Sequence, residues 1–205
     1  MNTLTQHLNQ LIRRVPAWPL YVLAAVLIAW HFWLALGGHY RPDPVRRLEW
    51  EYGLLALQFL LAALAITPLK RFTGLNLVKY RRALGLAAFM LALAHLLVWV
   101  VLDMQWLLGQ MLTDILKRPY ITVGMASFAL MLPLAVTSSN AFIRRLGAAR
   151  WRRLHRLVYP LALLAGVHFL WVRKGFQMEP VIYLGLIVLL LALRLPLLRR
   201  RAAAA

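Results

Sequence analysis

The chain has 205 residues, of which 62% are hydrophobic and 15% are charged, and its formal net charge is +18. Its mean hydropathy of +0.69 is well above that of an ordinary globular domain. The chain contains no cysteine, which excludes disulfides, cysteine-held iron–sulfur clusters and thiolate-ligated haem. It also lacks a Walker loop, a Rossmann glycine fingerprint and an HExxH motif, so we expect no soluble nucleotide-binding domain.

Six apolar stretches are long enough to cross about 30 Å of hydrocarbon, which takes about 20 helical residues. Each stretch is continuous rather than alternating, which favours helices over a β-barrel. We therefore predict an all-α, six-helix transmembrane bundle that forms a single domain over residues 1–205. The expected spans are about 17–36, 52–69, 83–102, 119–136, 154–172 and 180–198.

The first apolar stretch has a second interpretation. Arg13 and Arg14 precede it, as in a cleaved signal peptide, and the sequence LALGG resembles a small-residue cleavage site. The apolar run is longer than a signal core of about 7–15 residues. We therefore expect a helix that is retained in the membrane.

Charged residues are distributed unevenly between the two sets of loops. The two chain ends and the segments 70–82 and 140–156 carry 17 of the 24 Lys and Arg residues, and all six acidic residues lie in the other loops. The positive-inside rule then places both termini in the cytoplasm. The +18 charge is thus a signal of topology and of contact with membrane lipid, and we expect no nucleic-acid partner.

Four histidines lie within the apolar spans. His31, in the first span, is interpreted as hydrogen-bonded to a neighbouring helix, which leaves His95, His155 and His168 as the candidate ligands. An ionisable group at membrane depth is costly and needs a partner, and neutral imidazole is a usual ligand of haem iron. With the orientation given above, His95 and His168 fall in the outer halves of their spans, so we expect them to be the axial ligands of one haem. The alternative is that each is a structural residue, hydrogen-bonded to a neighbouring helix.

A second, inner haem would take His155 as one ligand. The residue fourteen positions before His95 is Arg81, and a rise of about 21 Å with an offset of about 40° would put both on one helix face. Arg81 could bind a haem propionate or, unusually, approach the iron; the alternative is a positive-inside anchor. His155 and His168 differ by about 140° on an ideal helix, and Pro160 between them could kink the span or change its winding.

Residues 103–120, between the third and fourth spans, have the pattern of a short amphipathic helix at the outer membrane surface. Its expected apolar face consists of Trp106, Leu107, Met111, Leu112 and Ile115. Its expected polar face consists of Gln105, Gln110 and Asp114. Because this helix would follow His95, it is a candidate docking surface for an electron acceptor; the alternative is a helix that only caps the bundle.

Five segments between roughly Thr67 and Trp171 carry a family resemblance: ITPLKRFTG, KYRRALGLAAFMLALAH, LKRPYITVG, VTSSNAFIRRLGAARWRRLHRLVY and GVHFLWV. In order and spacing they resemble the MsrQ (YedZ) family, the haem-binding membrane subunits of a bacterial methionine sulfoxide reductase system. That family is part of a wider ferric-reductase-like transmembrane group, in which paired histidines on two helices hold two stacked haems. The resemblance covers about half of the chain.

The resemblance implies one or two b-type haems, with His95, His168 and His155 at ligand positions and Arg81 at the fourth. It also implies flavin mononucleotide (FMN) as an optional cofactor, and the quinol pool or a cytoplasmic flavin reductase as electron donor. The implied acceptor is the periplasmic molybdenum enzyme MsrP, which would itself reduce methionine sulfoxide, and the implied location is the bacterial inner membrane. Two alternatives stay open: a transmembrane ferric or quinone reductase with another acceptor, and a non-redox membrane scaffold or transporter.

Overall fold

The computed structural model describes residues 3–172 and 175–194, and every regular element in this part of the chain is helical. The all-α prediction is therefore confirmed. The α-helices are α1 (Thr3–Arg14), α2 (Pro19–Leu36), α3 (Pro44–Thr73), α4 (Arg81–Leu97), α5 (Leu108–Lys117), α6 (Pro119–Val136), α7 (Asn140–Leu146), α8 (Ala148–Leu154), α9 (Val158–Val172) and α10 (Met178–Ala192). Three short elements join them: the 3-10 helices η1 (Val78–Tyr80) and η3 (His155–Leu157), and the π-helix η2 (Val98–Asp103).

Five helical segments are long and apolar enough to cross a membrane: Pro19–Leu36, Pro44–Thr73, Val78–Asp103, Pro119–Val136 and Ala148–Val172. They coincide with the first five predicted spans. The helix α10 is also apolar, but its 15 residues are fewer than the about 20 that a span needs. Residues 195–198, the end of the sixth predicted span, lie outside the described residues.

The ends of the long helices follow from local sequence. Both α3 and α6 begin with a proline, Pro44 and Pro119, whose missing N–H is no loss at the first helical position. The Asp43 carboxylate caps α3 by accepting a hydrogen bond from the Arg46 amide at 3.0 Å. At the other end Gly74 adopts a left-handed conformation with φ of 75°, which stops α3 and turns the chain toward η1.

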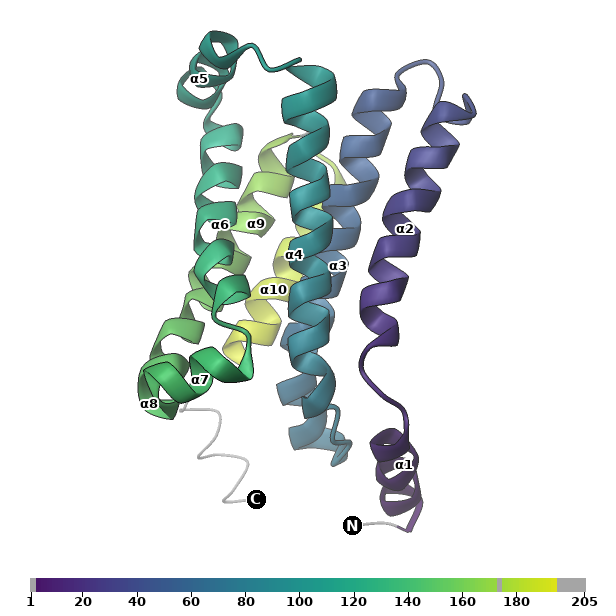
Figure 1. Cartoon of the computed structure of the whole chain (residues 1–205), viewed down its shortest axis with the longest axis vertical. Helices are drawn as coiled ribbons and strands as arrows, with labels where there is room; N and C mark the ends of the chain where they lie inside the picture. Colours follow the sequence, from purple (N-terminus) through teal and green to yellow (C-terminus); the bar gives the residue numbers. More distant parts are fainter. Residues whose placement is uncertain (1–2, 173–174, 195–205) are drawn as a thin grey trace.

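Two helix pairs organise the bundle (Figure 1). One pair is α3 with α4, and the other is α6 with α9; α10 packs against both α3 and α9, and α2 packs against the first pair. The main buried cluster joins the two pairs through fully buried side chains such as Leu64 on α3, Leu161 on α9 and Ile187 on α10. This core fixes the position of α4, which carries His95, relative to α9, which carries His168.

The two ends of the bundle differ in charge. Figure 1 shows α5 at one end and α1, α7 and α8 at the other. The acidic residues belong to the α5 end, because they lie at the start of α3, around α5 and at the start of α10: Asp43, Glu49, Glu51, Asp103, Asp114 and Glu179. The opposite end carries the basic segments of α7 and α8 and of the α3–α4 connection.

The N-terminal helix α1 is attached to the basic end by polar contacts. The buried Asn9 side chain donates to the Gly74 carbonyl at 3.1 Å and accepts from the Asn76 amide at 2.8 Å. The Tyr80 hydroxyl donates to the Ile12 carbonyl at 3.1 Å. One asparagine thus satisfies two backbone groups in the turn that follows α3.

Replacing Asn9 with alanine should release α1 from the bundle, because the Gly74 carbonyl and the Asn76 amide would both lose their partner. An unsatisfied buried group costs roughly 1–3 kcal/mol, so amide hydrogen exchange over residues 5–14 should accelerate by about tenfold or more. The matched control is Gln10→Ala at the exposed neighbouring position. Equal exchange rates in the two variants would show that Asn9 does not hold the helix.

Candidate functional site

Two imidazole rings from different helix pairs face each other near the α5 end of the bundle. His95 lies near the end of α4 and His168 near the end of α9, and their ring centres are 6.2 Å apart with the ring planes at 75°. Both side chains are partly buried. The structure therefore brings together the two histidines that the sequence placed at equal depth.

Hydrogen bonds fix the tautomer of each ring in its neutral form. The Nδ1 atom of His95 lies 2.8 Å from the Glu49 carbonyl oxygen, and that of His168 lies 2.7 Å from the Tyr120 carbonyl oxygen. A carbonyl oxygen can only accept, so each Nδ1 must carry the proton and donate it. The Nε2 lone pair of each ring is then the one that can bind a metal ion, in the arrangement that metal-ligating histidines usually have.

The spacing of the rings fits a metal ion between them. Two imidazoles bound from opposite sides at about 2.0 Å, each with its ring centre about 1.2 Å behind the nitrogen, would have centres about 6.4 Å apart. The observed separation is 6.2 Å. No group of three or more His, Asp or Glu side chains that could hold a metal ion occurs among residues 3–172 and 175–194. The pair therefore suits a cofactor that brings its remaining ligands, and a haem supplies four equatorial nitrogens.

His155 lies near the basic end of the bundle, in η3, and makes different contacts. Its Nε2 is 3.1 Å from the Thr137 hydroxyl, and its ring stacks on Trp151 with 3.9 Å between ring centres. The Thr137 hydroxyl already donates to the Pro133 carbonyl at 2.6 Å, so the His155 Nε2–H donates to it. His155 therefore uses its Nε2 for this hydrogen bond, and in the neutral ring the lone pair is on Nδ1.

Arg81, the first residue of α4, donates to the Thr67 hydroxyl at 2.7 Å. Arg194 lies in the same region: it donates to the Leu64 carbonyl, and its guanidinium is 5.9 Å from the ring centre of Tyr159. In the part of the chain that the structure describes, no contact joins Arg81 to His155. All six carboxylates lie at the opposite end, so no acidic side chain neutralises this pair of arginines.

Arg81, His95, His155 and His168 each bond to the partner helix of their own pair. On α4, Arg81 and His95 both reach α3, as the calculated offset of about 40° predicts. On the other pair, His155 and His168 both reach α6, at Thr137 and Tyr120. The 3-10 turn at His155–Leu157 explains this, because three residues at about 120° each reduce the offset of about 140° to about 80°.

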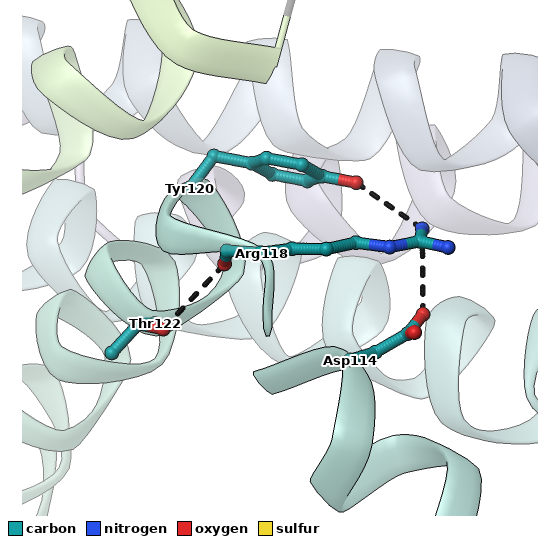
Figure 2. Close-up of polar contacts among 4 residues, drawn as sticks. All are labelled: Asp114, Arg118, Tyr120 and Thr122. Atoms are coloured by element: carbon teal, nitrogen blue, oxygen red, sulfur yellow. Dashed lines mark hydrogen bonds and ion pairs between the residues drawn. The ribbon is translucent and has the colours of Figure 1, made fainter. Parts of the chain in front are cut away.

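A polar cluster at the start of α6 holds the residue that accepts the His168 hydrogen bond (Figure 2). Arg118 forms an ion pair with Asp114 at 3.3 Å and donates to the Tyr120 hydroxyl at 3.4 Å. The Tyr120 hydroxyl and then the Asp114 carboxylate raise the pKa of the Arg118 guanidinium above its usual value. The Thr122 hydroxyl adds a bond to the Ile115 carbonyl, so α5 and the first turn of α6 are fixed together.

The predicted orientation of α5 was wrong at Asp114, which is buried instead of facing water. The helix begins only at Leu108, after Gln105 and Trp106 adopt left-handed conformations that turn the chain sharply. Asp114, Met111 and Ile115 then face α6, while Gln110 is exposed as expected. The exposed apolar stripe consists of Leu108, Leu112 and Leu116, at 66, 62 and 82% exposure.

The backbone carbonyls of Glu49 and Tyr120 are site groups that sequence reasoning missed. A carbonyl belongs to every residue, so only the packing of two helices shows which one receives an imidazole. The residue types at positions 49 and 120 give no signal of this role.

The chain matches the family described as the ferric-reductase-like transmembrane component over residues 49–166. This segment covers more than half of the chain, includes Arg81, His95 and His155, and ends just before His168. The protein is therefore a ferric-reductase-like membrane protein. No solved structure matches the chain.

Several curated relatives cover almost the whole chain. Proteins from Brucella ovis, Brucella canis and Brucella suis, each named as the haem-binding subunit MsrQ of protein-methionine-sulfoxide reductase, are 47% identical over 189 residues. That alignment covers 91% of this chain and 86% of each relative. The chain belongs to the MsrQ family of haem-binding membrane subunits, and the sequence-based family resemblance is confirmed.

Replacing Arg118 with glutamine should loosen α5 from α6, because the buried Asp114 carboxylate would lose its partner. Arg118 itself is half exposed, so we expect a cost of roughly 1–2 kcal/mol, seen as about tenfold faster hydrogen exchange over residues 108–117. Lys117→Gln removes the same charge at the adjacent exposed position and should leave the exchange unchanged. If both variants exchange alike, the ion pair does not hold the helix.

Proposed function

We propose that this chain is a haem b electron-transfer subunit that passes electrons outward across the bacterial inner membrane to periplasmic MsrP, which reduces methionine sulfoxide in proteins. The observation that carries the proposal is the pairing of His95 and His168. Their separation, their fixed Nδ1–H tautomers and their origin on two helices suit one haem held by two axial imidazoles. Membership of the MsrQ family supports the same assignment.

Haem would supply one-electron chemistry at this position. The protein's part is to hold both imidazoles neutral, oriented and apart from water. The Glu49 and Tyr120 carbonyls fix the rings, and hydrogen bonding at Nδ1 makes each Nε2 a stronger electron donor. Ligand orientation and hydrogen bonding to the ligand are two of the factors by which a protein sets the reduction potential of a haem.

The proposed topology has six spans with both termini in the cytoplasm, within one domain. It rests on the separation of charge along the bundle, with basic segments at the α1, α7 and α8 end and every acidic residue at the α5 end. The α5 end would then be periplasmic, which places the His95–His168 pair on the outer side. Electrons leaving this pair would reach an acceptor in the periplasm.

An inner haem is proposed between the two helix pairs at the basic end, with His155 as one ligand and Arg81 as a contact for an anionic propionate. The two arginines Arg81 and Arg194, which no acidic side chain neutralises in the described part of the chain, support an anionic occupant in this region. His155 would have to present its Nδ1, or leave Thr137 to present its Nε2, before it could bind iron.

The proposed donor is the quinol pool or a cytoplasmic flavin reductase, with FMN as a further cofactor at the basic end. That end offers cationic side chains on α7 and α8, such as Arg144, Arg145, Arg152 and Arg153, to an anionic partner or phosphate. At the opposite end, the water-facing side of α5, with the exposed Gln110, is the proposed docking surface for MsrP.

Replacing either His95 or His168 with alanine should remove most of the haem absorbance of the purified protein, since one imidazole alone cannot complete the axial pair. Electron transfer from the reduced protein to purified MsrP should fall with it, by at least about tenfold. The measurements are haem quantification per chain and the rate of MsrP reduction.

The control is His31→Ala, which removes another membrane histidine whose Nδ1 lies 2.6 Å from the Tyr40 hydroxyl. It should keep its haem. Full haem in both the His95 and the His168 variants would overturn the ligand assignment. A haem-loaded protein that reduces other acceptors but not MsrP would instead indicate a ferric or quinone reductase.

Replacing Arg81 with alanine should alter the spectrum or potential of a minor, inner haem component while leaving the outer haem unchanged. Arg81→Lys keeps the charge but loses the planar fork that binds carboxylates in two places, so it should rescue only partly. Arg82→Ala is the matched control, because Arg82 binds the Asn140 side chain instead. Wild-type spectra in both Arg81 variants would make Arg81 a membrane anchor and nothing more.

A further inference from the structure

The His95 ring lies directly against a glycine of the neighbouring helix. A Cβ atom built on Gly53 of α3 would lie 3.2 Å from Nδ1 of His95 and 3.3 Å from its Cε1. Such distances are shorter than an ordinary van der Waals contact of about 3.5–4.0 Å. Any side chain at position 53 would therefore push the ring away from the Glu49 carbonyl.

The His168 ring makes the same kind of contact with the other helix pair. A Cβ atom on Gly124 of α6 would lie 2.7 Å from Nδ1 of His168 and 2.8 Å from its Cε1. These distances are too short for any real contact, so the ring would have to move. It would then lose its 2.7 Å hydrogen bond to the Tyr120 carbonyl.

The two contacts follow one rule of helix geometry. In each pair the accepting carbonyl belongs to the residue four positions before the glycine: Glu49 before Gly53, and Tyr120 before Gly124. Residues four apart lie above one another on one helix face, and the carbonyl of the first points toward the second. A carbonyl has two lone pairs, so it can accept from the imidazole as well as from its own helix. An imidazole can approach it only where the residue above has no side chain.

Other glycines of the chain do not share this environment. A Cβ on Gly166 would meet the side chains of Ile187 and Leu184, so that glycine serves the packing of α9 against α10. A Cβ on Gly85 of α4 or Gly185 of α10 would meet nothing within 4 Å. A Cβ on Gly37 would lie 3.0 Å from Nδ1 of His39, but that imidazole is only two residues further along the chain, in the turn that follows α2. Contact with an imidazole of another helix is thus specific to Gly53 and Gly124, one in each helix pair.

We propose that Gly53 and Gly124 are positioning residues for the haem, each holding one axial imidazole in hydrogen-bonding contact with a helix carbonyl. This inference rests on the proposed function, in which His95 and His168 are the axial ligands. Through the Nδ1–H bond each glycine sets the tautomer, the plane and the basicity of its ring, and hence the potential of the bound haem. The tighter contact at Gly124 makes the His168 side the more sensitive of the two.

The test compares Gly53→Ala and Gly124→Ala with Gly85→Ala and Gly185→Ala in the full-length, haem-loaded protein. The readouts are the haem midpoint potential, the EPR spectrum of the ferric haem, and the rate of haem loss to apomyoglobin. Thermal unfolding monitored by circular dichroism reports separately on the fold. Alanine favours a helix over glycine by about 1 kcal/mol, so the two control variants should be as stable as the wild type or more so.

We expect both site variants to raise the midpoint potential, because an imidazole without its Nδ1–H bond donates less charge and stabilises ferric iron less. The EPR g values should change because the angle between the ring planes changes. Haem should be held about 10- to 100-fold more weakly in Gly124→Ala, as for other groups that orient a metal ligand, and by a smaller factor in Gly53→Ala. The control variants should match the wild type in all three readouts.

The outcomes separate this inference from the proposed function. If the wild-type protein binds no haem, the proposed function itself is wrong. If the wild type binds haem through His95 and His168 but both site variants keep its potential, EPR spectrum and haem retention, the positioning role is wrong and the function stands. Equal changes in the site and control variants would also overturn it. If Gly124→Ala fails to fold, the milder Gly53→Ala decides.

Discussion

The hydrogen bond between an imidazole Nδ1–H and a helix carbonyl is the interaction on which this site depends. A histidine at membrane depth must find a polar partner, and no water is at hand to provide one. Here the partner is a backbone group of the adjacent helix, the Glu49 carbonyl for His95 and the Tyr120 carbonyl for His168. The same bond that lowers the cost of burial leaves Nε2 as an electron-pair donor, so stability and ligand function come from one contact.

That contact makes demands on the surrounding structure. Each ring must bring its Nδ1 edge close to a helix, which requires a glycine at the point of approach and a close pairing of α3 with α4 and of α6 with α9. The carbonyl must also stay in place. At Tyr120 this is achieved by the ion pair of Arg118 with Asp114, which anchors the start of α6 to α5 (Figure 2). A surface helix is thereby connected to a ligand inside the bundle.

Sequence patterns predicted the helical fold and the equal depth of His95 and His168. Both predictions depend only on the number of residues along apolar helices. The same patterns also placed Arg81 on the face of α4 that His95 uses. Sequence patterns did not predict features that depend on how two helices pack against each other. The burial of Asp114 depends on how α5 packs on α6, and the direction of His155 depends on a 3-10 turn that periodicity does not reveal. The importance of Gly53 and Gly124 appears only when the imidazoles of other helices are present.

The division of the bundle into two helix pairs has a consequence for biogenesis. Each pair contains both a histidine and the carbonyl that accepts its hydrogen bond, and the two partners lie 46 and 48 residues apart along the chain. When the first pair enters the membrane during synthesis, His95 therefore finds its partner before the second pair exists. The same holds for His168 within α6 and α9. Each histidine therefore has its hydrogen-bond partner within its own helix pair, before the other pair or a cofactor is present. A metal centre can then be assembled last, between two helix pairs that are already formed.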